Sequence, residues 1–224
     1  AKNEAKKSFG DSRVFIEKFI EDPHHIEIQI IGDQFGNYLH LGERDCSIQR
    51  RNQKIIEESP SPFINTKKRD LMANQAIALA KSVNYFSVGT VEFIVDKNKK
   101  FYFLEMNTRL QVEHPVTELV TGIDLVEMMI RVASKEKLGI EQNEISFFGS
   151  AIEVRIYAED PTRNFMPSAG RLTRYSPPKE LSLKSKIIRN DSGVFEGSDI
   201  SLKYDPMISK LCAWSDNRDK TIEL

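Results

Sequence analysis

Two glutamates lie inside strongly apolar segments of the chain. Glu92 belongs to GTVEFIV and Glu105 to FYFLEMN. A carboxylate buried among such residues costs several kcal/mol unless it is paired or binds a metal. If the two segments are neighbouring strands with Glu92 opposite Glu105, both carboxylates and the amide oxygen of Asn107 converge. Such a set of oxygen ligands suits Mg²⁺, but the spacing alone also allows both acids to face solvent or to pair with Lys or Arg.

The polar pattern continues in the next segment, EMNTRLQVEHPVTE. In an extended chain, its alternate residues would project from one face: Glu105, Asn107, Arg109, Gln111 and Glu113. Arg109 could hold a carboxylate-like anion through two parallel hydrogen bonds. Glu113 could then accept a proton from that anion. A solvated strand face is the other interpretation of this row.

A sheet is needed to position these side chains. Residues 87–96 and 100–107 have the composition of strands, and the short polar turn at 97–99 makes them antiparallel neighbours. Alternation or β-branched and aromatic content predicts further strands at residues 13–20, 25–32, 38–45, 151–160, 170–175, 186–193 and 207–214.

Helices are expected between these strands. The first covers about residues 66–83, with Asn65 or Thr66 as N-cap. Its expected buried face consists of Leu71, Ala76, Leu79, Ala80 and Val83. Residues 115–122 form a short helix that Gly122 ends, Asp124 caps another helix that extends to about residue 134, and Asp219 and Lys220 begin a last one. The fold class is α+β with a β-rich C-terminal part, and a soft boundary falls within residues 135–146.

Composition excludes several function classes. The chain has 224 residues, with 32 Lys and Arg against 33 Asp and Glu, for a net charge of −1. This balance argues against a nucleic-acid-binding protein, which normally has a basic excess, and no segment is apolar enough for a membrane span. Cys46 and Cys212 are far apart and lack metal-ligand spacing, which argues against zinc and a disulfide framework and favours reduced thiols in an intracellular protein.

Longer motifs resemble a known family. EMNTRLQVEHPVTE and ERDCSIQRRNQKIIEESP are similar to the signature of the biotin carboxylase component of biotin-dependent carboxylases, within the ATP-grasp superfamily. EKFIEDPHHIEIQIIGD, GTVEF, AIEVRIYAEDP and SDISLKYDPMISKL match in the same order, so the resemblance covers about residues 13–210. Among the branches, Asn52 and DSGVFEGSDISLKYDPM most resemble the propionyl-CoA carboxylase alpha chains.

The resemblance implies a two-part fold. Residues 1–140 would form the C-terminal half of the ATP-grasp domain, an antiparallel sheet with helices. Residues 147–224 would form a truncated, β-rich biotin carboxylase C-terminal domain.

The resemblance also implies metal-binding and nucleotide-binding residues. Glu92, Glu105 and Asn107 match the metal-binding positions, in agreement with the argument from the two strands. The positions that match the nucleotide site are Glu17, Lys18, Ile20, His25 and Gln49, with Lys18 and Ile20 acting largely through backbone groups.

Catalytic positions follow from the same resemblance. Lys54 matches a basic residue beside phosphate and bicarbonate, and Arg109, Gln111 and the backbone of Val112 match the bicarbonate pocket. Glu113 matches the general base that deprotonates bicarbonate. Arg155 matches the arginine that steadies the ureido oxygen of biotin, where a fixed guanidinium stabilises developing negative charge.

The implied reaction is the MgATP-dependent activation of bicarbonate as carboxyphosphate, followed by carboxylation of N1 of biotin on a carrier domain. Its cofactors are ATP and Mg²⁺ or Mn²⁺. The implied partners are the biotin carboxyl carrier domain, a carboxyltransferase subunit and a second copy in a homodimer or larger oligomer, in the bacterial cytosol or the mitochondrial matrix. No glycine-rich phosphate loop occurs in the chain. The resemblance places that loop upstream, so we expect the isolated chain to have little or no turnover.

Two alternatives remain at this point. Another ATP-grasp ligase with a carboxylate substrate would share Glu92, Glu105 and Asn107, but it has no need of Arg155 or of QRRNQK. A non-catalytic dimerisation or scaffold piece of a carboxylase complex would be expected to lose its acids or its base. Both kinds of residue are present in this chain.

Overall fold

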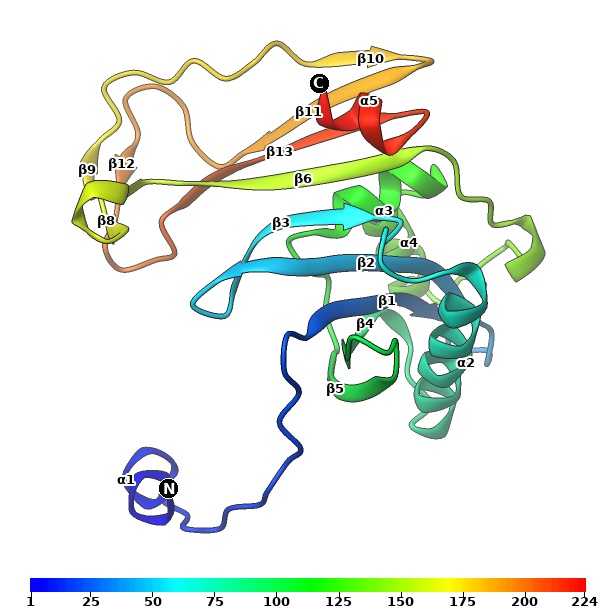
Figure 1. Cartoon of the computed structure of the whole chain (residues 1–224). Helices are drawn as coiled ribbons and strands as arrows, with labels where there is room; N and C mark the ends of the chain where they lie inside the picture. Colours follow the sequence, from blue (N-terminus) through cyan, green and yellow to red (C-terminus); the bar gives the residue numbers. More distant parts are fainter.

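A large antiparallel sheet forms the centre of the protein. The computed structural model describes residues 1–224. Nine strands lie in the order β10-β11-β13-β6-β3-β2-β1-β4-β5, from the top of Figure 1 to its bottom. Their bounds are β1 His24–Gly32, β2 Tyr38–Arg50, β3 Gln53–Ser59, β4 Ser87–Val95, β5 Phe101–Asn107, β6 Ser150–Tyr157, β10 Leu181–Leu183, β11 Lys186–Ser192 and β13 Met207–Ser215. The expected α+β class is confirmed.

Five helices and several short elements complete the fold. The helices are α1 Lys2–Phe9, α2 Thr66–Ser82, α3 His114–Thr121, α4 Leu125–Ala133 and α5 Arg218–Ile222. Two-residue strands pair as β7 Glu159–Asp160 with β8 Met166–Pro167, and as β9 Gly170–Arg171 with β12 Asp199–Ile200. Short 3₁₀ turns cover Gln142–Glu144 and Pro161–Arg163. None of the helices is both long and apolar enough to cross a bilayer.

The two faces of β1 and β4 have different partners. Ile26, Ile28 and Ile30 pack with α2 in the larger apolar cluster, and residues of the opposite parity on β1, such as Ile31, pack with α4. Glu27 and Gln29 share the parity of Ile31, so they lie on the face away from α2. The polar side chains of the central strands are therefore directed to the side of the sheet that α3 and α4 cover.

Helix α2 begins as predicted, and its expected buried face is confirmed for Ala76 and Ala80 but is wrong for Leu71 and Val83. The side chain of Asn65 accepts a hydrogen bond from the Lys68 amide at 3.0 Å, which confirms the N-cap. Leu71 and Val83 were expected in the core, but they are 47% and 59% exposed. The buried residues are Met72, Ala73, Ala76 and Ala80. A row of alanines lets the helix lie close to the sheet, which a face lined by leucine and valine would not allow.

Two strand predictions are wrong, and two strands of the large sheet, β3 and β10, were not predicted. Residues 13–20 belong to no sheet; they lead from α1, which lies away from the body of the protein, toward β1 (Figure 1), and Lys18 contacts Tyr102 of β5. Of residues 170–175, only Gly170 and Arg171 are in a strand. β-Branched and aromatic content favours an extended backbone, but only a neighbouring strand makes it part of a sheet. β3 was not predicted because its sequence, QKIIEES, has no clean alternation.

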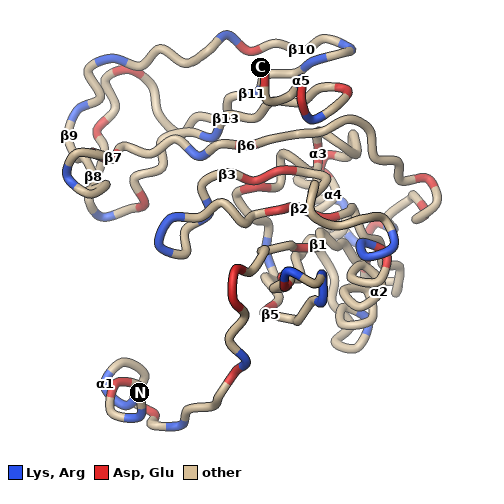
Figure 2. Tube along the Cα trace, viewed as in Figure 1, with Lys and Arg blue, Asp and Glu red and all other residues tan.

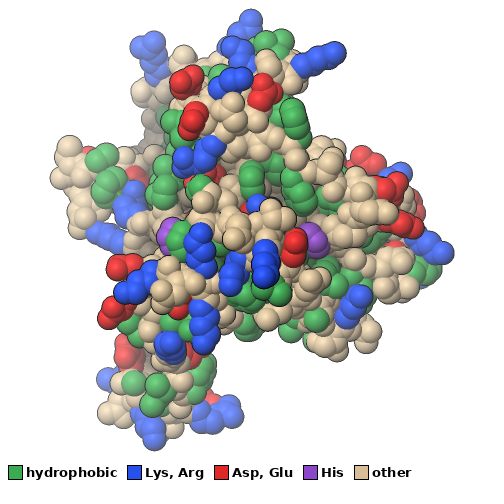
Figure 3. Space-filling model, turned by 45° about the vertical axis from the view of Figure 1, so that its right-hand side comes forward, with side chains coloured by type: hydrophobic (Ala, Val, Ile, Leu, Met, Phe, Trp, Pro, Cys, Tyr) green, Lys and Arg blue, Asp and Glu red, His purple; other side chains and the backbone are tan.

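Charges are distributed evenly over the protein. Basic and acidic residues both occur throughout the trace, including the N-terminal arm (Figure 2). On the face shown in Figure 3, Lys and Arg side chains are interspersed with Asp and Glu. Cys46 and Cys212 are buried and free, as expected, and burial raises the pKa of both thiols well above the usual range.

Candidate active site

Four adjacent strands place charged residues in one row across the sheet. Arg44 lies opposite Glu27 in the β1–β2 ladder, and Glu27 lies opposite Glu92 in the β1–β4 ladder. Glu92 in turn lies opposite Glu105 in the β4–β5 ladder, as predicted. Residues opposite each other in antiparallel strands share a face. The paired carboxylates are therefore part of a longer row.

A cleft of about 680 Å³ opens beside this row, and we call it the polar cleft. Only three of its 18 lining residues are hydrophobic. Its lining includes His25, Gln49, Lys54, Glu92, Glu105, Asn107, Arg109, Gln111, Val112, Glu113 and Arg155. The fold therefore brings eleven of the fourteen predicted site residues into one cleft.

The three predicted metal ligands are in mutual contact. The Asn107 side-chain nitrogen donates to Glu92 Oε1 at 2.9 Å and to Glu105 Oε1 at 3.2 Å. The amide nitrogen of Asn107 therefore bridges the two carboxylates, and its amide oxygen accepts from Arg109 Nη2 at 3.4 Å. Two carboxylates and an amide oxygen are hard ligands of the kind that Mg²⁺ prefers, so the residues present fit that ion.

Lys54 links three carboxylates in the centre of the site. Its Nζ lies 2.6 Å from Glu27 Oε2, 3.0 Å from Glu92 Oε1 and 2.6 Å from Glu113 Oε1. Burial disfavours its charge, but the surrounding carboxylates prevail and raise the pKa of Lys54 well above its usual range. Lys54 is therefore a fixed cation in the wall of the cleft.

The carboxylate of Glu92 stays ionised for a related reason. Burial opposes its charge, but the contact with His25 Nε2 at 2.7 Å and the ammonium of Lys54 outweigh burial. Together they lower the pKa of Glu92 to about 2. A carboxylate that is ionised at neutral pH is what a cation ligand requires.

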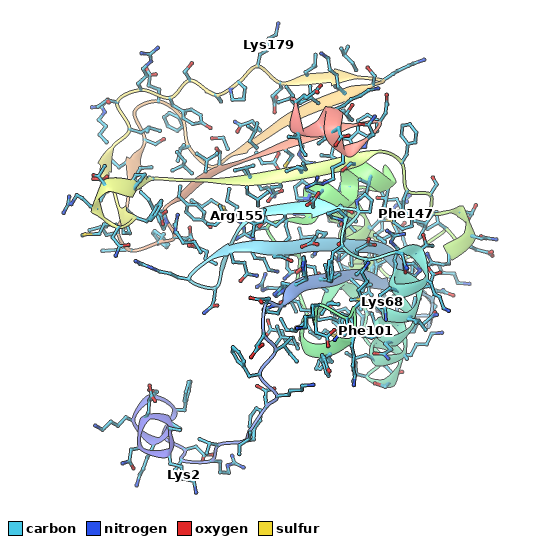
Figure 4. All side chains as sticks on the ribbon, viewed as in Figure 1. Lys2, Lys68, Phe101, Phe147, Arg155 and Lys179 are labelled. Carbon is cyan, nitrogen blue, oxygen red and sulfur yellow. The ribbon has the colours of Figure 1, made fainter.

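Glu113 lies between two cations. Lys54 contacts one of its oxygens, and Arg155 Nη2 lies 3.1 Å from the other. The carboxylate is 2% exposed overall, yet it lines the polar cleft. Arg155 lies on β6, beside β3 (Figure 4), and its Nε donates to Glu57 Oε1 at 2.7 Å. Burial raises the pKa of Glu57 to about 7, although Arg155 acts in the opposite direction.

The predicted extended row of five polar residues is only partly correct. β5 ends at Asn107, a turn follows, and α3 begins at His114 with Glu113 as its N-cap. Gln111 and Glu113 are 6% and 2% exposed, whereas Arg109 stays exposed at the rim. All five line the polar cleft because the chain folds back over the sheet. The irregular backbone thus replaces the strand that we expected.

The remaining predicted nucleotide residues line a second cavity. Glu17, Lys18 and Ile20 belong to a pocket of about 390 Å³ with apolar walls that include Tyr102 and Phe103. Pro23, Ile94 and Leu104 line both this pocket and the polar cleft, so the two are contiguous. An apolar slot next to a charged cleft can accommodate a flat ring joined to a polar chain.

Buried residues that were not predicted from the sequence support the site from within the sheet. Arg44 is fully buried, and its guanidinium donates to Glu27, Gln29, Thr90, Gln111 and Thr117. Gln111 also donates to Glu92 Oε1 at 2.7 Å, so it links the guanidinium of Arg44 to the cleft. Glu27 and Gln29 alternate with isoleucines on β1. This alternation of polar and apolar residues is the sequence pattern that could have indicated a polar network beneath the site.

Comparison with known proteins decides the family. Residues 1–141 match the family described as carbamoyl-phosphate synthase L chain, ATP binding domain, and residues 153–224 match the biotin carboxylase C-terminal domain. The chain belongs to the biotin carboxylase family. It is 59% identical to a propionyl-CoA carboxylase alpha chain of Ruegeria pomeroyi, which it matches over 100% of its own length and 35% of the relative.

Other members show the same pattern. The chain is 57% identical to the mitochondrial propionyl-CoA carboxylase alpha chain of Homo sapiens, over 98% of this chain and 30% of that one. A crystal structure of the biotin carboxylase domain dimer of Hydrogenobacter thermophilus 2-oxoglutarate carboxylase, in complex with MgADP, ADP and bicarbonate, aligns with a TM-score of 0.92 at 45% identity. That alignment covers 99% of this chain and 48% of the other. The chain thus spans about a third of the length of its curated relatives.

Proposed function

We propose that this chain carries the catalytic half of a biotin carboxylase within an acyl-CoA carboxylase whose substrate is propionyl-CoA. The reaction is the MgATP-dependent activation of bicarbonate as carboxyphosphate, followed by carboxylation of N1 of biotin on a carrier protein. One observation carries the proposal: Glu113 is held between Lys54 and Arg155 in a cleft that also contains Glu92 and Glu105.

Glu113 is the proposed general base. Its carboxylate lines the cleft, so it can reach the proton of a bicarbonate ion there. Arg109, Gln111 and the backbone of Val112 line the same cleft and would hold the anion. Lys54 and Arg155 keep the base in place and provide positive charge where negative charge develops, on the transferring phosphoryl group and on the ureido oxygen of biotin respectively.

Glu92, Glu105 and Asn107 are the proposed ligands of Mg²⁺ or Mn²⁺. When bound, the ion neutralises charge on the phosphate oxygens of ATP. Glu17, Lys18 and Ile20 would contact the adenine in the apolar pocket, while His25 and Gln49 lie on the phosphate side in the polar cleft. Because the two cavities are contiguous, a single nucleotide can place its adenine in the apolar pocket and its phosphates in the polar cleft.

We also propose where the chain divides into two domains and which partners it has. Residues 1–140 are the C-terminal half of the ATP-grasp domain, and residues 147–224 are the biotin carboxylase C-terminal domain; the two family matches support this boundary. A biotin carboxyl carrier domain, a carboxyltransferase subunit and a second copy of the protein are the proposed partners. Bacterial and mitochondrial relatives support a location in the bacterial cytosol or the mitochondrial matrix.

The two alternative functions are less well supported. Another ATP-grasp ligase would not need Arg155, yet Arg155 lines the cleft and contacts Glu113. A scaffold piece would not need a base between two fixed cations, because buried charges are costly to maintain.

The test replaces the matching segment of the Ruegeria pomeroyi alpha chain with this chain, and it measures bicarbonate- and biotin-dependent release of ADP. The chimeric protein is expected to be active, and the isolated chain is expected to have little or no turnover. MgADP binding to the chimera is the control for folding. A chimera that binds MgADP but releases no ADP in response to bicarbonate would contradict the proposed function. Robust turnover by the isolated chain would contradict only its expected inactivity.

A further inference from the structure

Lys210, on β13, contacts the backbone that leads into Glu113. Its Nζ donates to the carbonyl oxygen of Val112 at 2.5 Å, although the two residues are 98 positions apart. Lys210 is 9% exposed and does not line the polar cleft. Its ammonium is therefore directed at the peptide group between Val112 and Glu113, behind the cleft wall.

The strand register places Lys210 beside Arg155. The two residues lie directly opposite each other in the β6–β13 ladder, so their side chains share a face. Arg155 contacts the side chain of Glu113, and Lys210 contacts the carbonyl one peptide earlier. Two neighbouring cations of the sheet thus hold two neighbouring residues of the turn before α3.

This arrangement is costly for a purely structural contact. Like charges that face each other in a ladder repel, and each buried ammonium loses its hydration. Asp191 offsets part of the cost, since its Oδ2 lies 3.5 Å from Lys210 Nζ across the β11–β13 ladder. An apolar side chain could fill the same space without either penalty, but it could not donate a hydrogen bond to Val112.

We propose that Lys210 is a positioning residue for the bicarbonate reaction. It fixes the peptide plane between Val112 and Glu113, and so sets the direction in which the Glu113 carboxylate and the Val112 backbone face the cleft. This inference rests on the proposed function, because it assigns Lys210 to the same base and the same anion pocket.

Arg218 provides a control that is independent of Lys210. It lies on α5, and its Nη2 donates to Glu58 of β3 at 3.2 Å. Arg189 would not serve, because it donates to both oxygens of Asp191, the acid beside Lys210. Lys210→Met removes the hydrogen bond to Val112, Lys210→Arg restores a donor, and Arg218→Met removes the control contact.

The kinetic test uses the full-length carboxylase and separates the substrates. A hydrogen bond from a charged donor is worth about 1.5–3 kcal/mol, so the KM for bicarbonate in Lys210→Met should rise roughly tenfold or more. The KM for MgATP should stay within about twofold, Lys210→Arg should recover much of the loss, and Arg218→Met should leave the KM for bicarbonate unchanged. Equal increases in both KM values, or the same effect in Arg218→Met, would overturn the positioning role.

A second measurement does not depend on catalysis. The Glu113 amide belongs to the same peptide group as the Val112 carbonyl, so its ¹H–¹⁵N resonance reports directly on the bond from Lys210. In the 224-residue chain, Lys210→Met should shift this resonance and speed its hydrogen exchange, while Arg218→Met should do neither. An unshifted resonance would refute the inference about Lys210. A shifted resonance in a carboxylase without bicarbonate-dependent activity would instead refute the proposed function.

Discussion

At the scale of single residues, the site works by distributing few cations among many carboxylates. Lys54 serves Glu27, Glu92 and Glu113, and Arg155 serves Glu57 and Glu113. Each carboxylate keeps a partner, so burial does not force all of them to become protonated. The two ends of this network differ, because the pKa of Glu92 is lowered to about 2 and that of Glu57 is raised to about 7.

The Glu113→Gln variant tests the proposed base at this scale. In the full-length enzyme it should largely abolish biotin carboxylation, by roughly 10² or more, because a general base typically contributes 10²–10⁴ to a rate. Binding of MgATP should remain measurable by calorimetry, since Glu113 is assigned to bicarbonate. If both biotin carboxylation and nucleotide binding are lost together, the assigned role is wrong.

At the scale of elements, the start of β6 depends on a close approach that only glycine allows. Gly149, with φ of +73°, immediately precedes β6, and a Cβ at this position would lie 2.2 Å from the Ser215 carbonyl oxygen and 2.7 Å from Trp214 Nε1. This contact joins β6, which carries Arg155, to the end of β13. The strands that carry Arg155 and Lys210 are therefore packed through a position without a side chain.

Gly149→Ala should destabilise the protein by about 3 kcal/mol or more, because backbone strain of about 1–2 kcal/mol adds to overpacking of about 1–3 kcal/mol. Gly10→Ala is the matched control, since Gly10 has the same φ of +73° but nothing within 4 Å of the added Cβ. The free energy of unfolding in urea measures both. Similar values for the two variants would show that the close approach to β13 does not matter.

At the scale of the whole molecule, one sheet joins all parts of the site. β3 pairs with β6, so the sheet continues from β1, β2 and β3, which lie before residue 60, to β6 and the strands that follow residue 149. At this junction Glu57 lies opposite Glu153, and both are fully buried. Burial raises the pKa of Glu153 to about 8, with the nearby Glu57 adding to the effect of burial.

These two acids predict how stability depends on pH. Between their unfolded pKa and the folded values of about 7 and 8, the folded state holds more protons than the unfolded state. Their contribution to stability is therefore present at acidic pH and is lost as the pH rises through those folded values. The free energy of unfolding should fall between about pH 4.5 and pH 8, by on the order of a few kcal/mol, and become constant above that range.

Glu153→Gln isolates this effect, because it removes one titrating group and keeps the shape of the side chain. Urea unfolding at several pH values should show a flatter slope in Glu153→Gln than in the wild type. Burial lowers the pKa of His40 and His114, but both histidines are present in the variant and in the wild type, so their effect cancels when the two slopes are compared. Parallel slopes in the two proteins would mean that Glu153 is already ionised in the folded state.

The sequence by itself determined the family, the β4–β5 hairpin and the chemistry of most site residues, because these depend on local alternation, turn residues and motifs. Only the tertiary structure decided which residues support them. Arg44, Glu57 and Lys210 reach the site from strands that are distant in sequence, and no local pattern encodes which strands are neighbours. The same limit explains residues 13–20, whose composition favours an extended backbone but cannot supply the partner strand that a sheet requires.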